Sequence, residues 1–231
     1  MSNNPVHYEL NDAIAILRLD DGKANAVNPA LIRGVNDALD KAAQEAKAVV
    51  LTGRPGRFSA GFDLTVLQSG PEAGRTLVTA GAQMLLKLFT HPQPVVAAST
   101  GHAIAAGGFM LLASDTRLGV QGDFKIGLNE VAIGMTLPEF GLMFARERLS
   151  KRHFTNAVIQ ARLYSPAEAV DVGFLDRICA ADTLLDEALG EARRLAALDL
   201  PSYGRTKGRA RNALAEQVRS GLDEDIARLM A

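Results

Sequence analysis

Short segments without charged residues alternate with longer amphipathic segments along this 231-residue chain, and this alternation limits the possible folds more than any other feature. Ala48–Thr52 and Val95–Ser99 are almost wholly apolar, as is typical of strands buried on both faces of a parallel sheet. Leu77–Phe89, which lies between them, has apolar residues at helical spacing. Because parallel strands need crossover connections, the sequence predicts an α/β fold with right-handed crossovers.

Both ends of the chain depart from this alternation. Val6–Leu10 and Ile14–Leu19 alternate apolar and polar residues around Asn11-Asp12, which predicts a β-hairpin. From Ala181 onward only helical patterns remain. We therefore expect a core domain of residues 1–179 that carries the functional site, followed by a helical region of residues 180–231 that covers the site or joins subunits.

The charge of the chain argues against nucleic acid as a partner. The formal net charge is −1 and the basic residues are scattered, so no basic face would displace the counterions of a nucleic acid. One short basic run alternates along the tail, at Arg205, Lys207, Arg209 and Arg211. We interpret this run as a solvated helix face, with a phosphate contact as the alternative.

Cysteine content and hydropathy limit the setting in which the protein works. Cys179 is the only cysteine, which excludes a disulfide framework and a CxxC metal site. No basic region followed by an apolar one opens the chain, and the longest apolar runs are far shorter than the ~20 residues that span a bilayer. We expect a cytoplasmic protein without membrane association and without a bound metal.

Several well-known functional motifs are absent. Residues 53–57 lack the lysine of a phosphate-binding loop, and the glycines near residue 107 have the wrong spacing for a dinucleotide turn. No histidine pair has the spacing of a zinc protease, and Ser59 is not the centre of a GxSxG motif. These absences argue against nucleotide-binding, zinc and serine hydrolase sites.

At two places in the chain, an apolar strand is followed by a turn of small residues. Val49–Thr52 precedes the segment Ser59–Asp63, and Val95–Ala98 precedes Ala105–Gly108. Loops that follow parallel strands gather at one edge of a sheet, and the first amides of a helix have no internal acceptor. We predict that a backbone N–H from each loop converges on one negatively charged oxygen.

Glu130 lies in a third loop, which we expect at the same edge. Its neighbours Leu128, Val131 and Ile133 are apolar, and apolar surroundings raise the pKa of a carboxyl group. A carboxyl group with a raised pKa suits proton transfer at neutral pH. The alternative is a loop carboxylate that caps a helix.

Four sequence blocks resemble the enoyl-CoA hydratase/isomerase, or crotonase, superfamily. They are GRFSAGFDL (56–64), the stretch 95–115, LNEVAIGMTLP (128–138) and SPAEAVDVGFLDRI (165–178). The resemblance implies a crotonase fold, a spiral of ββα units with a C-terminal helical extension. It also implies an acyl-CoA thioester substrate in fatty acid metabolism, no cofactor beyond the coenzyme A of the substrate, and a homotrimer or dimer of trimers.

The resemblance also assigns roles to residues. It implies that the backbone N–H groups of Phe62 and Ala106 bind the thioester oxygen, with Gly107 as the alternative to Ala106. Family members hold coenzyme A mostly by backbone contacts from two segments. In this chain those contacts correspond to Lys23, Ala24 and Ala26 in the first segment and to Ala60, Gly61, Asp63 and Leu64 in the second. For Asp63 we prefer a structural role as a helix cap.

The chain departs from the family pattern at Phe109. Hydratases of the family use two glutamates; the second matches Glu130, but the first falls on Phe109, which cannot activate water. The resemblance is therefore strongest to single-glutamate Δ3,Δ2-enoyl-CoA isomerases, with Glu130 as the acid/base and Phe109 as an apolar wall. The alternatives are an inefficient hydratase, another crotonase reaction such as thioester hydrolysis or decarboxylation, and a non-catalytic acyl-CoA binding protein.

Overall fold

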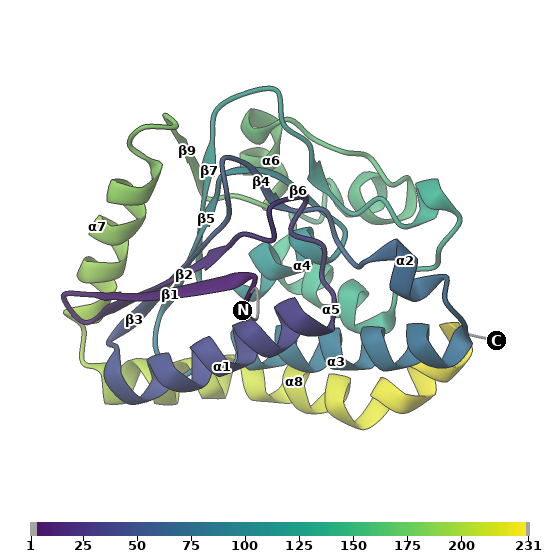
Figure 1. The fold of residues 1–231 in the computed structure, drawn as a ribbon, viewed down its shortest axis with the longest axis horizontal. Coiled ribbons are helices and arrows are strands. Elements are labelled where there is room, and N and C mark those ends of the chain that lie inside the picture. Colours follow the sequence, from purple (N-terminus) through teal and green to yellow (C-terminus); the bar gives the residue numbers. More distant parts are fainter. Residues whose placement is uncertain (1–3, 230–231) are drawn as a thin grey trace.

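The strands of the protein form two sheets in the computed structural model, which describes residues 4–229 (Figure 1). The larger sheet has the strand order β1-β2-β3-β5-β7-β9, and the smaller one has the order β4-β6-β8. The strands are β1 (Val6–Asn11), β2 (Ile14–Leu19), β3 (Ala48–Thr52), β4 (Gly56–Ser59), β5 (Val95–Ser99), β6 (Gly101–Ile104), β7 (Thr116–Val120), β8 (Ile126–Gly127) and β9 (Arg177–Cys179).

Helices connect the strands and follow them to the end of the described chain. They are α1 (Pro29–Glu45), α2 (Leu64–Leu67), α3 (Pro71–Phe89), α4 (Ala106–Ala113), α5 (Glu139–Arg148), α6 (Pro166–Val172), α7 (Leu184–Ala196) and α8 (Leu200–Leu229). The predicted helix Leu77–Phe89 therefore begins six residues earlier, at Pro71, a residue favoured in the first turn of a helix.

The large sheet confirms the predicted α/β arrangement. Apart from the antiparallel β1–β2 hairpin, all of its strand pairs are parallel. Every residue of β3 and β5 is buried, because helices cover both faces of this sheet. The hairpin turn lies one residue later than predicted, since Asp12 and Ala13 are the pair with positive φ, 47° and 65°.

Two hydrophobic cores lie on the two faces of the large sheet. Side chains of α1, α3, α4, α5 and α8 form the larger core, whereas α7 forms the smaller one with the opposite face of the strands. Figure 1 shows α1, α3 and α8 lying together along one side and α7 on the other. Both C-terminal helices therefore contribute side chains to the cores that the preceding residues form.

The local sequence patterns did not predict the strands of the smaller sheet, although the family resemblance implied repeated ββα units. The predicted loop Gly53–Phe62 contains strand β4, and β6 follows β5 after a single residue. Gly101 permits this arrangement, because a Cβ there would lie 2.2 Å from the carbonyl carbon of Gly56 in the neighbouring strand. The pairs β3–β4, β5–β6 and β7–β8 are each followed by helix, so the chain repeats a ββα unit.

The basic run near the C-terminus is not the wholly solvated helix face that we expected. Arg205 and Arg209 are exposed, but Lys207 and Arg211 turn inward and form ion pairs with Asp115, at 2.7 Å and 2.8 Å.

Among the helices of residues 4–229, none combines the length and the hydropathy needed to cross a membrane.

Candidate active site

The smaller sheet brings the three predicted loops to one edge. Its strands are all parallel, with Ser59 beside Ala103 and Ile104 beside Gly127 at their carboxyl ends. The loops that leave these ends carry Phe62, Ala106 and Glu130. They therefore meet as predicted, but they follow β4, β6 and β8, not β3 and β5 of the large sheet.

The backbone N–H of Phe62 points away from Val27, the residue with which Phe62 forms an isolated parallel bridge. Val27 donates to the carbonyl of Gly61 at 2.8 Å and accepts from the N–H of Asp63 at 3.1 Å. Because these two bonds flank Phe62, its own N–H points to the opposite side. Among the described residues, no group accepts a hydrogen bond from it.

Ala106 supplies a second amide without an acceptor. It is the first residue of α4, and the described residues provide no acceptor for its N–H or for those of Gly107 and Gly108. All residues of α4 are buried, so little solvent screens the positive end of its dipole. The preceding residue, Ala105, has φ 53° and donates to the carbonyl of Gly127 at 2.9 Å, which ties α4 to the third loop.

Gly61 holds the first two loops in direct contact. A Cβ at Gly61 would lie 2.7 Å from the Cβ of Ala105 and 3.4 Å from the nitrogen of Ala106. The bare backbone of Gly61 thus keeps the space in front of the Ala106 amide free. Gly107 has another function, because its Cα packs against the carbonyl of Ser59, where a Cβ would approach to 2.4 Å.

Glu130 has the features of a proton-transferring carboxyl group. Only 6% of the residue is exposed, and its Oε2 has no hydrogen-bond partner among the described residues. Burial raises the pKa of the Glu130 carboxyl to about 7. Its carbonyl accepts from the N–H groups of Ile133 (3.0 Å) and Met135 (2.9 Å), which fixes the backbone around it. The carboxylate does not cap the short 3₁₀ helix Val131–Ile133 that follows it, so the alternative expectation was wrong.

Phe109 occupies the helical turn after Ala106 and is fully buried. Its ring meets that of Phe140 edge-on, with centroids 5.7 Å apart, and lies over Gly141 of α5. A Cβ at Gly141 would be only 2.5 Å from Cζ of Phe109. The structure therefore places a phenyl ring and no carboxylate at this position of α4.

The predicted coenzyme A segments also lie together. The carbonyl of Ala24 accepts from the N–H of Ala60 at 3.0 Å, while Lys23 is exposed. Asp63 accepts from the N–H of Thr65 at 2.9 Å and caps α2, which confirms its preferred structural role. Leu64 is 50% exposed beside it.

Asn25 is a supporting residue that the sequence analysis did not single out. It is fully buried, with φ 52°, and its Nδ2 donates to the carbonyls of Leu19, Arg57 and Phe58. These bonds fasten the segment around Ala24 and Ala26 to β4. Asparagine tolerates the left-handed region better than most residues, so an Asn within a turn-rich segment was the available signal.

The described part of the chain contains no group of three or more His, Cys, Asp or Glu residues arranged to hold a metal ion. The loops at this edge carry two amides without a described acceptor and one buried carboxyl group.

Known proteins resemble this chain over most of its length. Residues 9–226 match the family model described as Enoyl-CoA hydratase/isomerase. A putative enoyl-CoA hydratase of Thermus thermophilus is 31% identical over 197 residues, which cover 83% of this chain and 77% of the relative. The matched human peroxisomal bifunctional enzyme is longer, and this chain spans 27% of it.

Solved structures share the whole fold. An enoyl-CoA hydratase/isomerase family protein from Pseudomonas syringae superposes with a TM-score of 0.95 at 39% identity, over 97% of this chain and 98% of that one. The apo structure of an enoyl-CoA isomerase from Mycobacterium tuberculosis gives a TM-score of 0.92 at 36% identity, over 99% of both chains.

Proposed function

The chain belongs to the enoyl-CoA hydratase/isomerase family and has its crotonase fold, and we propose that it converts 3-enoyl-CoA to 2-enoyl-CoA with Glu130 as the single acid/base. The observation that carries this proposal is the buried carboxyl group of Glu130, whose Oε2 has no partner among the described residues, on the loop next to two amides that also lack a described acceptor. Phe109 lies where a second carboxylate would be needed for hydration. The likeness to an M. tuberculosis protein described as an enoyl-CoA isomerase supports it, although a second structure of that protein describes it as a probable enoyl-CoA hydratase.

The proposed reaction needs one base and one oxyanion site. The thioester oxygen lies between the N–H groups of Phe62 and Ala106. Ionised Glu130 removes a proton from C2, the electrons move onto the thioester oxygen, and a dienolate forms. The same carboxyl group then returns the proton to C4, which leaves the double bond between C2 and C3. One oxyanion donor is typically worth ~10²–10³ in rate, and a positioned acid/base adds ~10²–10⁴.

The pKa of Glu130 suits both steps. With a pKa of about 7, the carboxyl group is partly ionised at neutral pH, and its protonated form is still acidic enough to give the proton back. A group with an ordinary carboxyl pKa would be a weaker base. Burial, which raises the pKa, is thus the property that makes Glu130 useful.

Substrate binding is proposed for the segments that adjoin these amides. Coenzyme A would contact Lys23, Ala24 and Ala26, together with the backbone from Ala60 to Leu64. A separate cleft of about 570 Å³ lies between Pro29 at the start of α1 and the connection from α2 to α3, and none of these proposed contacts lines it.

The direct test is isomerisation of 3-enoyl-CoA, followed by the absorbance of the conjugated 2-enoyl product. Glu130→Gln keeps the shape of the side chain but removes the base, and we expect at least a ~100-fold loss of kcat. Glu147→Gln is the matched control, because Glu147 is an exposed glutamate that makes none of the described hydrogen bonds or ion pairs. An unchanged rate in Glu130→Gln would reject the proposal.

Hydration is the second candidate, and the similarity to a putative enoyl-CoA hydratase favours it. Phe109→Glu restores the second carboxylate, so a large gain in hydration of 2-enoyl-CoA would show that position 109 limits this reaction. Thioester hydrolysis and decarboxylation can be assayed with the same variants. Tight binding of acyl-CoA esters without turnover of any of them would instead indicate a binding protein.

A further inference from the structure

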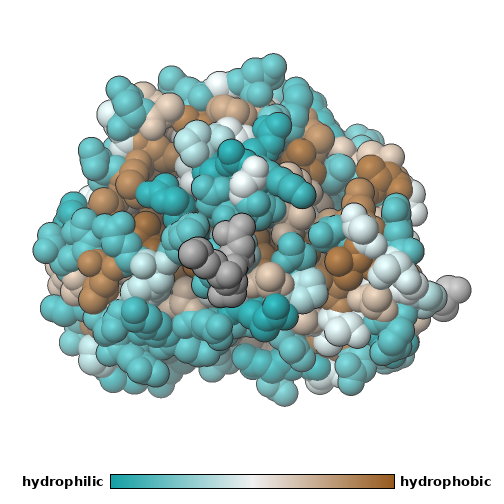
Figure 2. Space-filling view, viewed as in Figure 1, coloured by the Kyte–Doolittle hydropathy of each residue, from teal (hydrophilic) through white to brown (hydrophobic). Residues whose placement is uncertain are grey.

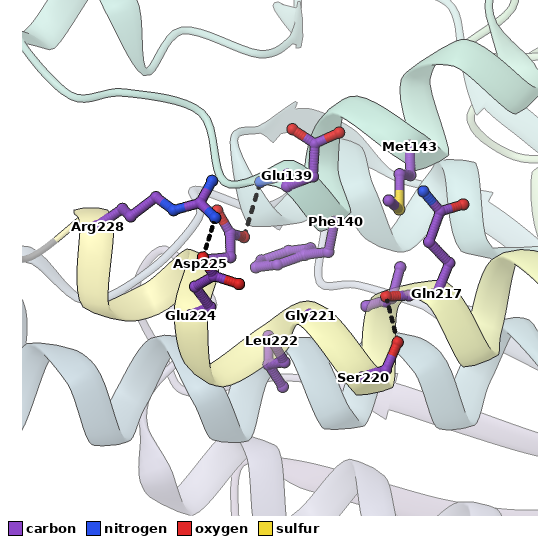
Figure 3. Close-up of a pocket in the computed structure, with 11 residues that line it drawn as sticks. Glu139, Phe140, Met143, Gln217, Ser220, Gly221, Leu222, Glu224, Asp225 and Arg228 are labelled. Carbon is purple, nitrogen blue, oxygen red and sulfur yellow. Dashed lines mark hydrogen bonds and ion pairs between the residues drawn. The ribbon is translucent and has the colours of Figure 1, made fainter.

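We propose that Asp225, on the C-terminal helix α8, is a positioning residue that holds the Glu130 loop in place by capping α5. The inference extends the proposed function, since it concerns how Glu130 reaches its place. The observation behind it is a hydrogen bond from the N–H of Glu139 to Oδ2 of Asp225, at 2.8 Å, across 86 residues of chain. Figure 3 shows this bond between the two helices.

The first turn of helix α5 needs a hydrogen-bond acceptor from another part of the chain. Its N-cap residue is Pro138, which has no side-chain acceptor and makes no capping hydrogen bond. The first amides of a helix lack internal acceptors, and a carboxylate near them also interacts favourably with the helix dipole. Asp225 satisfies this requirement, since its Oδ2 accepts from the backbone N–H of Glu139.

The capped end of α5 is also the end of the catalytic loop. Residues 128–138 join β8 to α5, and Glu130 lies near the start of this loop. At its beginning, the loop is fixed by the pairing of Gly127 with β6. At its end, it is fixed by α5. Between these ends, the carbonyl of Glu130 holds the turn through the amides of Ile133 and Met135.

Helix α8 is anchored firmly enough to serve as this support. Leu222 and Ile226 on the same helical turns are 6% and 1% exposed and belong to the main core. Farther toward its start, Lys207 and Arg211 bind Asp115, just beyond the end of α4. One rigid helix therefore holds the end of the helix that supplies the Ala106 amide and the start of the helix that follows Glu130.

The surroundings of Asp225 leave it available for this bond. Its neighbour Glu224 pairs with Arg228, as Figure 3 also shows, so the nearby cation is engaged elsewhere. The three residues line a cleft of about 320 Å³ between α5 and α8, which Phe140 of α5 also lines. Phe140 in turn contacts Phe109 of α4.

The test compares Asp225→Ala, which lacks an acceptor, with Asp225→Asn, which keeps a neutral one. The matched control is Asp223→Ala, two residues away on α8, where the exposed carboxylate makes none of the described hydrogen bonds or ion pairs. We expect kcat for 3-enoyl-CoA to fall ~10-fold in Asp225→Ala, because small displacements of a catalytic group are costly. KM should change less than ~2-fold, since the proposed coenzyme A contacts lie on other loops. Asp225→Asn should lose ~3-fold, because hydrogen bonds to a charged acceptor are roughly twice as strong as neutral ones.

Amide hydrogen exchange tests the same inference without using activity. In Asp225→Ala, the amides of Ile133, Met135 and Glu139 should exchange at least ~10-fold faster than in the wild type, whereas Asp223→Ala should leave them unchanged. If Asp225→Ala does not fold, Asp225→Asn provides both measurements. Unchanged exchange in a folded Asp225 variant, or a loss of kcat matched in Asp223→Ala, would overturn the positioning role. If the wild type fails to isomerise 3-enoyl-CoA while exchange responds as expected, the proposed function fails but the support of the loop stands.

Discussion

The buried carboxyl group of Glu130 has an energetic cost that depends on pH. Its pKa in the folded protein is about 7, raised by burial from an ordinary value of 4.5. The protonated form is therefore favoured by folding. The contribution of Glu130 to the free energy of unfolding is therefore fully present below pH 4.5, and it is lost as the pH rises through 7.

Replacement of Glu130 by glutamine should therefore stabilise the protein, and increasingly so at high pH. The difference in unfolding free energy between Glu130→Gln and the wild type should grow from pH 4.5 to 7 and then level off, by on the order of 3 kcal/mol. Urea unfolding at pH 5, 7 and 9 measures it. A difference that stays constant with pH would contradict the raised pKa.

Gly61 offers a test of the oxyanion site that leaves every acid and base intact. Gly61→Ala would place a methyl group 2.7 Å from the Cβ of Ala105 and 3.4 Å from the nitrogen of Ala106. The two loops would move apart, so we expect a ~10²-fold fall in kcat for the proposed isomerisation. Gly22→Ala is the control, since Gly22 also has positive φ, +74°, but has open space around it. Equal activity of both variants would argue against this geometry.

At the scale of secondary structure elements, an ion cluster joins α8 to the rest of the molecule. Asp115 accepts from Lys207 and pairs with Arg211, and its backbone carbonyl accepts from Arg148. The side chains of Lys207, Arg211 and Asp115 are only 6%, 11% and 10% exposed. This burial lowers the pKa of Lys207 to about 8, and burial likewise lowers the pKa of Arg148 to about 10.

Removal of that carboxylate should be strongly destabilising. Asp115→Asn leaves the buried cations without their counter-charge, and we expect a loss of about 3–5 kcal/mol in unfolding free energy. Asp186→Asn, at an exposed position on α7, should change it by less than about 0.5 kcal/mol. Chemical denaturation with both variants measures the effect. A small loss in Asp115→Asn would mean that solvent reaches the cluster more freely than the structure indicates.

Prediction of strands from the sequence succeeded where the burial of an apolar segment determines the structure. It failed where pairing with neighbouring strands determines the structure. β3 and β5 are apolar along their whole length, so their sequences identify them. β4 and β6 have only four residues each, with glycine and a charged or polar residue in both. They are strands because they pair with each other and with β8, a contact that no local pattern contains.

At the scale of the whole molecule, the sequence predicted residues of a candidate site but not what supports them. The small-residue turns and the apolar neighbourhood of Glu130 pointed to three loops, and the family resemblance then implied Phe62 and Ala106. Asp225 did not, because its partner Glu139 is 86 residues away. Lys207 was predicted to be solvated for the same reason, because its partner Asp115 is 92 residues away. The spacing of apolar residues indicates which face of a helix is buried. It does not indicate which residues that face contacts.

The surface of the molecule bears on assembly, and we propose a homotrimer or a dimer of trimers. Figure 2 shows hydrophobic residues reaching the surface in several places. Beyond Glu130, Val131 and Ile133 are 48% and 49% exposed, and Ile159 is 60% exposed. Burial of these side chains in a subunit interface would remove apolar surface from water. Light scattering should give three or six times the mass of the chain, and a monomer would contradict the proposal.

The contact between Phe109 and Gly141 constrains how such a site can change during evolution. While the ring keeps its position, a side chain at position 141 would force it to move, because the Cβ would lie 2.5 Å from Cζ of Phe109. A substitution at 109 that removes the ring would leave space against α5 that a larger residue at 141 could fill. The effects of substitutions at the two positions should therefore not be additive, and the order in which they occur would decide how stable the intermediate is.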